Sequence, residues 1–309
     1  MPRAEVREIE CKSVINPVKG MPFRWSANPY RGCTHACLYC YARVTHTYLD
    51  LGPGEDFQRI LFAKVNAPAV IRRELARPGW RRELVAIGTS TDPYQPIEGR
   101  YRLTRGLLEA LAEYRTPASL TTKSTLVVRD RDVLRELDRV AGATVYVSIG
   151  TLDREVWRRL ERGTPSPQDR LRAVAMLAAA GIPVAVLMAP ILPGLTDRPA
   201  SIRAVIAAAR EAGAAAVHPA VLRLDPGVRE YFLEGLAEHY PHLARSYERL
   251  YRDRCAPRAY VAPLERRVAA WVAGAGLGGG RPRRAAVGAE PQPGGCSGAA
   301  HRTQLTLPL

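Results

Sequence analysis

The stretch Asn28-Pro-Tyr-Arg-Gly-Cys33-Thr-His-Ala-Cys37-Leu-Tyr-Cys40-Tyr-Ala-Arg43 places three cysteines within eight residues, in the spacing C-x3-C-x2-C. Three thiolates on one short loop can hold three corners of a cubane iron–sulfur cluster, which normally takes four cysteines. The other cysteines are scattered along the chain, at positions 11, 255 and 296. Residues 33–40, called here the cysteine loop, would therefore leave one iron of a [4Fe–4S] cluster free to bind a ligand that is not protein.

A zinc site is the competing interpretation of the cysteine loop. Structural zinc usually takes four Cys or His ligands, and His35 and His46 lie nearby in the sequence. Spacing alone leaves a Cys3His zinc site open. An aromatic residue in the second spacer, Tyr39, and the β/α repeats downstream favour the iron–sulfur cluster.

Composition bounds the class of protein and the kind of partner. The 309 residues are 47% hydrophobic, which is enough to bury the core of one large α/β domain or two smaller ones. No signal peptide opens the chain and no apolar run reaches about 18 residues, so we expect a cytoplasmic protein without a membrane partner. The net charge of +15 favours a polyanionic partner such as nucleic acid. The alternative is that the Arg-rich and Ala-rich composition reflects a GC-rich genome.

Short apolar runs alternate with amphipathic helical runs over most of the chain. Strands are predicted at residues 26–32, 84–88, 118–122, 144–149, 184–189 and 216–222. Helices are predicted at 66–76, 102–114, 130–139, 153–161, 168–181 and 200–213. Apolar strands joined by crossover helices indicate a parallel sheet covered by helices. Six repeats predict an α/β fold of the partial (β/α)6 TIM-type barrel kind.

The flanking segments differ from this barrel, which should span residues 21–227. Residues 1–20 are polar and mixed, and we expect an arm laid over the domain. Residues 228–274 read as a helical extension whose aromatic stripe is typical of packing. Gly, Pro, Arg and Ala then dominate residues 275–303, which predicts a disordered linker.

The last six residues form a separate motif. Gln304-Leu-Thr-Leu-Pro-Leu309 resembles the short peptides that dock into the bacterial DNA sliding clamp. An exposed apolar peptide normally has a receptor, and a flexible linker would let it reach one while the enzyme domain works on DNA. The alternative is a hydrophobic C-terminus that folds back onto the core.

The cysteine loop at the end of a first strand, with an aromatic before its last cysteine, resembles the radical S-adenosylmethionine (SAM) enzymes, in particular the branch related to spore photoproduct lyase. The segments that carry the resemblance span residues 23–225. They are Asn28-Pro-Tyr-Arg-Gly-Cys33, Gly88-Thr-Ser-Thr-Asp-Pro-Tyr-Gln-Pro96, Thr121-Thr-Lys-Ser124, Val147-Ser-Ile149 and Met188-Ala-Pro-Ile191.

The resemblance implies that Cys33, Cys37 and Cys40 bind a [4Fe–4S] cluster whose free iron chelates the amino and carboxylate groups of SAM. One-electron reduction by an external donor of the flavodoxin or ferredoxin type then cleaves SAM to methionine and a 5′-deoxyadenosyl radical. The protein supplies binding, orientation and exclusion of side reactions, and its site should lie at the carboxyl ends of the strands.

The same resemblance implies which residues bind SAM. A segment after the second strand occupies the place for the SAM amino group, and its hydroxyls and carboxylate suit an ammonium partner: Thr89, Ser90, Thr91 and Asp92. A plain turn is the alternative for this segment. After the third strand, Lys123 is expected to pair with the SAM carboxylate. Further along, Ser148 is expected to bond the ribose or carboxylate, and Ala189 and Pro190 to pack on the adenine.

One departure limits how far the resemblance extends. Spore photoproduct lyase carries a hydrogen-donating cysteine just after its second strand, whereas Gly88 to Asp92 contain no thiol. A hydroxyl O–H bond is too strong to replace it, which argues against that enzyme's own reaction, the splitting of a thymine dimer. Tyr39 and Tyr41 flank Cys40 and are candidate relays for a hydrogen atom or electron, with packing around the cluster as the alternative.

The sequence therefore predicts a radical SAM enzyme that acts on nucleic acid, at a DNA lesion or modified base. Two alternatives stay open. One is a radical SAM enzyme that acts on a peptide or small molecule. The other is a non-catalytic iron–sulfur or zinc protein recruited to the sliding clamp.

Overall fold

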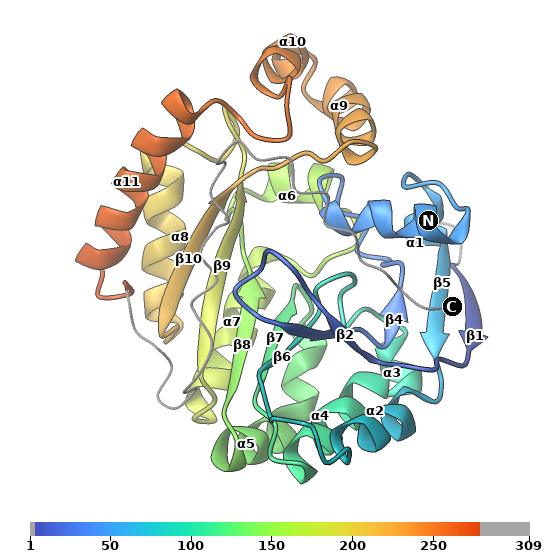
Figure 1. The fold of residues 1–309 in the computed structure, drawn as a ribbon. Helices are drawn as coiled ribbons and strands as arrows, with labels where there is room; N and C mark the ends of the chain where they lie inside the picture. Colours follow the sequence, from blue (N-terminus) through green and yellow to red (C-terminus); the bar gives the residue numbers. More distant parts are fainter. Residues whose placement is uncertain (1–3, 279–309) are drawn as a thin grey trace.

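Six parallel strands form the centre of the computed structural model, which describes residues 4–278 (Figure 1). The seven-stranded sheet has the order β10-β9-β8-β7-β6-β3-β2, and each pair is parallel except the edge pair β2–β3. Its strands are β2 (Ile15–Pro17), β3 (Trp25–Ala27), β6 (Val85–Ile87), β7 (Ala118–Thr122), β8 (Ala143–Ser148), β9 (Val184–Ile191) and β10 (Ala216–Val221). This confirms the α/β class and the partial barrel.

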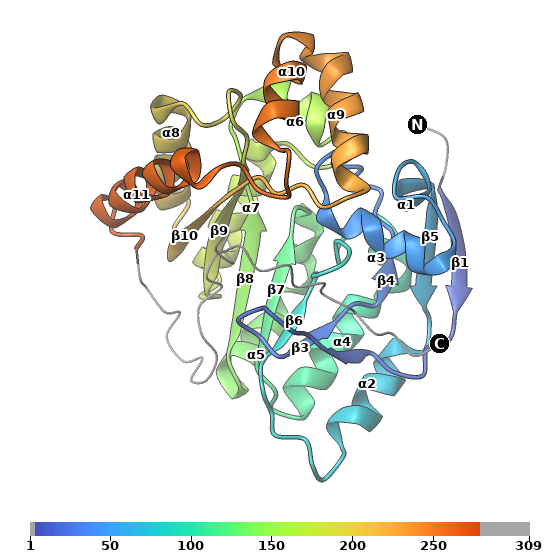
Figure 2. The same cartoon turned by 45° about the horizontal axis from the view of Figure 1, so that its top comes forward.

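Crossover helices cover the outer face of the sheet, as Figures 1 and 2 show. All six predicted helices are present, with ends moved by one or two residues: α2 (Ala67–Leu75), α4 (Leu103–Glu113), α5 (Arg131–Val140), α6 (Arg154–Leu160), α7 (Pro167–Ala179) and α8 (Pro199–Glu211). Helix α7 begins where the Ser166 side chain accepts a hydrogen bond from the Asp169 amide, with Pro167 at the first helical position. Their apolar faces pack on the sheet and bury one continuous core.

The prediction of one continuous strand over residues 26–32 is wrong. The chain instead forms β3 and then β4 (Tyr30–Arg31), which belongs to a second sheet of order β1-β5-β4. Pro29 lies at the break and has no N–H to continue a ladder, while its carbonyl accepts a bond from the Lys64 amide on β5 (Ile60–Lys64). The strand therefore changes sheets just before the cysteine loop.

The N-terminal residues contribute strands to both sheets. Within the expected arm, β1 (Glu5–Ile9) pairs in parallel with β5, and β2 pairs with β3. Four short elements lie in the connections of the two sheets: α1 (Asp56–Arg59), α3 (Glu98–Tyr101), and the 3-10 helices η1 (Tyr41–Leu49) and η2 (Thr125–Asp130).

The helical extension comprises α9 (Val228–His239), α10 (Pro241–Leu250) and α11 (Arg258–Gly274). Members of its aromatic stripe, including Phe232, Tyr247 and Tyr251, are fully buried, which confirms the packing role. The linker predicted from residue 275 is wrong in its first residues, because the apolar side chain of Leu277 is buried and its carbonyl accepts a bond from the Val217 amide. The rest of that linker and the peptide 304–309 lie outside the described residues. Within residues 4–278, no helix is long and apolar enough to cross a membrane.

Candidate active site

The cysteine loop leaves β4 through a position that only glycine fits. Gly32 has a φ of +75°, and a Cβ there would lie 2.8 Å from the Ile60 carbonyl oxygen and 2.9 Å from that of Phe57. The Cys33 amide donates to the same Phe57 carbonyl at 2.9 Å. Close backbone contact with β5 therefore fixes where the loop begins. Cys33 and Cys37 are buried, and Cys40 is half-buried.

The three thiols suit a metal cluster by their chemistry. All three are free cysteines, and burial raises the pKa of each thiol. Cys40 and Cys37 add to the increase in the pKa of Cys33, so the three groups lie within electrostatic range of one another. Bound iron would compensate the charge of three thiolates that burial otherwise disfavours. The donor set thus fits three ligands of a [4Fe–4S] cluster.

The histidines considered as zinc ligands are engaged elsewhere. The Nδ1 of His35 lies 3.1 Å from Oδ2 of Asp92, and both side chains are buried. The Nε2 of His46 lies 2.9 Å from the Ile60 carbonyl, and burial lowers the pKa of this imidazole. Within residues 4–278, no three His, Cys, Asp or Glu side chains converge on a point where they could hold a single metal ion. A cubane cluster instead takes each cysteine on a different iron.

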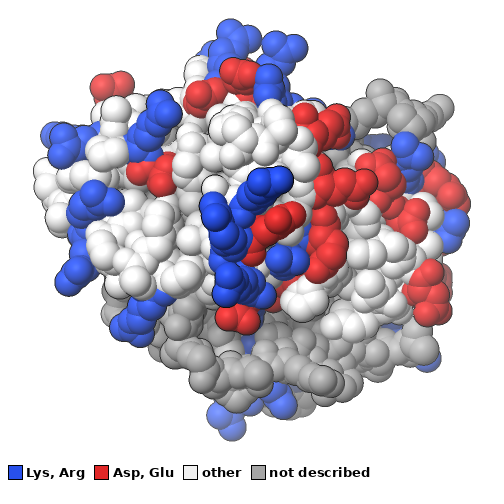
Figure 3. Space-filling model, turned by 90° about the horizontal axis from the view of Figure 1, so that it is seen from above, with Lys and Arg blue, Asp and Glu red and all other residues white. Residues whose placement is uncertain are grey.

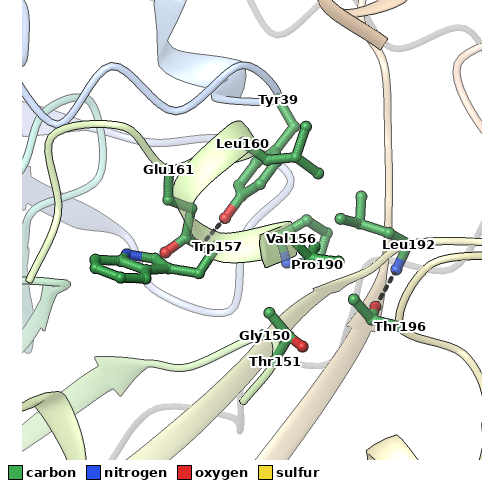
Figure 4. A pocket seen from close by; sticks show the side chains of 10 residues that line it. All are labelled: Tyr39, Gly150, Thr151, Val156, Trp157, Leu160, Glu161, Pro190, Leu192 and Thr196. Atoms are coloured by element: carbon green, nitrogen blue, oxygen red, sulfur yellow. Dashed lines mark hydrogen bonds between the residues drawn. The ribbon is translucent and has the colours of Figure 1, made fainter. Parts of the chain in front are cut away.

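Glu161, which no sequence motif marks, holds the loop from the opposite side. The Tyr39 hydroxyl donates to Oε1 of Glu161, and Figure 4 shows the two side chains pointing toward each other. Arg170 donates to Oε2 at 2.5 Å, and the Lys123 Nζ lies 3.6 Å from Oε1. The backbones of Cys37 and Glu161 also form an isolated antiparallel bridge. The carboxylate therefore connects the loop to two cations.

These cations keep the buried carboxyl group ionised. Burial alone would raise the pKa of Glu161, but Arg170 and Lys123 lower it to about 2. Arg170 is itself buried, and its second terminal nitrogen donates to the Ser148 carbonyl at 2.7 Å. The network therefore extends from the cysteine loop to the carboxyl end of β8.

The segment after β6 is fastened to the residue before the strand break. The Asn28 side chain accepts from the amides of Thr89 at 3.0 Å and Ser90 at 3.2 Å, and it donates to the Thr89 hydroxyl at 2.9 Å. The Tyr41 hydroxyl donates to the Thr89 carbonyl at 2.6 Å, although more than half of the Tyr41 side chain is exposed. Thr89 and Ser90 thus lie beside the cysteine loop.

The side chains of Thr91 and Asp92 form hydrogen bonds with other residues of the protein. The Thr91 hydroxyl donates to the Gly32 carbonyl at 2.5 Å. Asp92 accepts from the Thr122 hydroxyl at 2.7 Å and from the Lys123 amide at 2.6 Å. Burial would raise the pKa of Asp92, but its contact with the His35 ring and these hydrogen bonds hold the pKa below its usual value. Asp92 therefore ties the ends of β6 and β7 together.

The remaining candidate residues lie at neighbouring strand ends. Lys123 follows β7 with its Nζ 5.6 Å from the Tyr39 ring centroid. Ser148 is buried at the end of β8, and the half-buried Ala189 and Pro190 lie near the end of β9. A Cβ at Gly150 would lie 3.0 Å from the Pro190 carbonyl, so β8 and β9 approach closely here.

A pocket joins these strand ends to the cysteine loop (Figure 4). It lies between the ends of β8 and β9 on one side and α6 on the other. Its lining residues are Tyr39, Gly150, Thr151, Val156, Trp157, Leu160, Glu161, Pro190, Leu192 and Thr196. Tyr39 and Pro190, predicted for different roles, therefore line one cavity. The cavity is small and mostly apolar, and it lies next to the buried ionic network around Glu161.

Known proteins resemble this chain in sequence to different degrees. A family model described as "Radical SAM superfamily" matches residues 27–205. The uncharacterized protein Rv2578c of Mycobacterium tuberculosis is 44% identical over 270 residues, which cover 86% of this chain and 79% of that protein. The uncharacterized protein MJ0683 of Methanocaldococcus jannaschii is 30% identical over 196 residues, which cover 63% of this chain and 71% of that protein.

A solved structure of spore photoproduct lyase, complexed with dinucleoside spore photoproduct, has the same fold. Its TM-score is 0.57 at 17% sequence identity, and the match covers 76% of this chain. The chain spans 66% of the length of the lyase chain. The likeness extends to the fold of the strands and crossover helices.

Proposed function

The chain belongs to the radical SAM superfamily, as an enzyme that uses a [4Fe–4S] cluster and SAM, and from this premise we propose that it acts on nucleic acid, at a damaged or modified base. Enzymes of this family need an external electron donor. We propose a donor of the flavodoxin or ferredoxin type.

The single observation that carries the choice of nucleic acid is the fold shared with the lyase complexed with dinucleoside spore photoproduct. The charge of +15 adds support, since phosphates attract such a surface. Figure 3 views the face that carries the carboxyl ends of the strands, where Lys and Arg gather near the centre with Asp and Glu among them. The lyase's own reaction is not proposed, because Gly88 to Asp92 contain no thiol.

Cys33, Cys37 and Cys40 would hold the cluster. When bound, the cluster and SAM supply the radical chemistry that begins the reaction, and the residues of this chain bind, orient and exclude water. Cys33 and Cys37 are buried, which supports a site shielded from solvent. The Tyr39–Glu161 contact keeps the second spacer of the loop in place from the side of β8.

For the amino group of SAM, we propose the Thr89 carbonyl and the Ser90 hydroxyl as acceptors. Their segment is held against the cysteine loop by Asn28 and Tyr41. The side chains of Thr91 and Asp92 are hydrogen-bonded to other residues of the protein, which supports a role for both in positioning this segment.

The other proposed contacts follow the strand ends. Lys123 would pair with the SAM carboxylate while it stays near Glu161. Ser148 is proposed for the ribose or carboxylate. Ala189 and Pro190 are proposed to pack on the adenine, and their half-buried place near the end of β9 supports this.

The sequence leaves two roles open for Tyr39 and Tyr41: packing around the cluster, and relay of a hydrogen atom or electron. Tyr39 is buried and bonded to Glu161, which supports the packing role for this residue. Tyr41 is exposed and its hydroxyl reaches the Thr89 carbonyl, so we propose Tyr41 as the relay for a hydrogen atom or electron.

Anaerobic reconstitution tests the proposed function. The reconstituted protein is mixed with SAM and dithionite, and 5′-deoxyadenosine is measured with DNA oligonucleotides that carry defined lesions or modified bases. We expect one such DNA to stimulate SAM cleavage, with undamaged DNA as the matched control. Stimulation by a peptide or small molecule and by none of the DNAs would reject nucleic acid as the substrate and favour the alternative enzyme.

A further inference from the structure

A second pocket lies at the carboxyl end of β10, away from Tyr39 and the cysteine loop. One wall is the chain from Ala220 to Arg223, and the other is the first turns of α11. Its charged lining residues are Arg223, Arg258 and Glu265. The remaining lining is mostly apolar, with Val221, Ala256 and Val261 among the residues.

The backbone holds the two walls in place. Arg223 forms an isolated antiparallel bridge with Cys255, and the Leu224 amide donates to the Arg254 carbonyl at 2.8 Å. Arg258 and Glu265 are seven residues apart on α11, so both side chains lie on one face of the helix. Because Leu277, past the far end of α11, bonds to Val217 on β10, the helix runs antiparallel to the strand. Its first turn therefore lies at the edge of the sheet that carries the active site (Figure 2).

The charge in this pocket is not balanced by the surrounding residues. Burial lowers the pKa of Arg223 and Arg254 lowers it further, against the opposite effects of Glu265 and Asp225. Asp225 is occupied by Arg254, at 2.7 Å from its Nε. Within the part of the chain that the structure describes, no hydrogen bond or ion pair satisfies the Arg223 guanidinium. Glu265 is the one carboxylate among the lining residues, against the two arginines, and it makes no ion pair with Arg223. A half-buried guanidinium without a hydrogen-bonded partner is costly, and a bound anion would remove that cost.

We propose that this pocket binds a backbone phosphate of the nucleic-acid substrate, with Arg223 and Arg258 as its ligands. The proposal rests on the proposed function and specifies how the strand is held. The planar guanidinium matches the oxygens of a phosphate, and the apolar wall suits the adjoining sugar. Strand β10 is at one end of the sheet, and β3, which leads toward the cysteine loop, is near the other end. A strand fixed here would cross the carboxyl ends of the intervening strands.

Binding of a fluorescein-labelled single-stranded oligonucleotide, measured by anisotropy over a series of salt concentrations, tests the pocket. The reconstituted full chain is compared with the double variant Arg223→Gln/Arg258→Gln. We expect the double variant to bind about tenfold more weakly, with a log–log salt slope lower by about 1 to 2. The matched control is Arg77→Gln/Arg210→Gln, which removes the same charge from two exposed arginines, one just past α2 and one in the last turn of α8, and should bind like the unaltered protein.

Further measurements separate the possible failures. Equal iron content and circular dichroism show that the double variant is folded, and Arg223→Lys should restore part of the salt slope. If the unaltered protein binds the oligonucleotide without salt dependence, the proposed function is overturned and the pocket with it. If it binds normally and the two double variants are indistinguishable, only the pocket is overturned. The pocket is also overturned as a strand-binding site if Arg223→Gln/Arg258→Gln weakens the binding of thymidine monophosphate but leaves the binding of the oligonucleotide unchanged.

Discussion

The hydroxyl of Tyr39 donates a hydrogen bond to Glu161, a carboxylate 122 residues further along the chain. Tyr39 lies between two predicted cluster ligands, whereas Glu161 follows α6. Because Glu161 also contacts Arg170 and Lys123, the position of the cysteine loop depends on the ends of β7 and β8. One carboxylate therefore couples the loop to the strand ends that form the rest of the site.

Glu161→Gln should destabilise the fold strongly. The substitution leaves the buried guanidinium of Arg170 without its carboxylate, and breaking a buried pair in this way costs about 3 kcal/mol or more. Urea unfolding of the two proteins measures the change. Tyr39→Phe should cost less, about 1 kcal/mol, since it removes one hydrogen bond. Glu234→Gln, an exposed change on α9, is the control, and equal stability of the two Glu variants would contradict the role of Glu161.

Cys37→Ala should abolish the cluster. Two cysteines cannot hold three corners of a cubane, so the reconstituted variant should lose its iron and its brown visible absorbance, and all SAM cleavage with them. Cys11→Ala is the control, because the Cys11 thiol donates to Asn66 at 3.2 Å and is not part of the loop. Retention of iron by Cys37→Ala would show that another residue supplies the ligand.

Lys64 should make stability rise with pH. Burial lowers the pKa of this lysine from 10.5 to about 8, and its Nζ donates to the Asn28 carbonyl at 3.0 Å. Between these pH values the unfolded chain binds a proton that the folded chain has released, so stability increases as pH rises through that window. The gap between 10.5 and about 8 corresponds to about 3 kcal/mol.

The measurement is the free energy of unfolding from pH 7 to 10.5, taken as the difference between the unaltered protein and Lys64→Met. That difference should increase by about 3 kcal/mol, since the variant lacks the titrating group. The matched control is Lys19→Met, where the lysine is exposed and no such change is expected. A difference that stays constant with pH would show that Lys64 titrates normally.

Removal of residues 304–309 should abolish binding to the purified sliding clamp. The six residues supply a glutamine and apolar side chains that resemble clamp-docking peptides. Surface plasmon resonance of the full chain, the shortened chain and a chain with these six residues scrambled measures the effect. Binding that survives both changes would reject the assignment, and SAM cleavage should be the same in all three proteins.

Local pattern was enough to predict most of the fold. The apolar runs of β7, β8 and β9 and the amphipathic helices between them follow simple periodicities, and the cysteine spacing indicates the proposed cluster site. The pattern does not predict the small sheet, because β4 has only two residues and β1 is mostly exposed.

The polar scaffold of the site could not be read in the same way. Asn28 meets Thr89, and Glu161 meets Tyr39, only after the chain has folded, and neither pairing has a sequence spacing that marks it. The resemblance implies that Asp92 faces the SAM amino group, and a plain turn is the alternative. In the structure its acceptor positions are taken by the Thr122 hydroxyl and the Lys123 amide.

The change of sheets at Pro29 divides the site between two supports. The cysteine loop follows the sheet β1-β5-β4, whereas the segments after β6 to β9 belong to the large sheet. The tilt of one sheet against the other therefore sets how far any cluster stands from a substrate over the strand ends. Relatives could acquire new reaction positions by remodelling β1 or β5, at the periphery, while every residue that touches the reacting molecules stays the same.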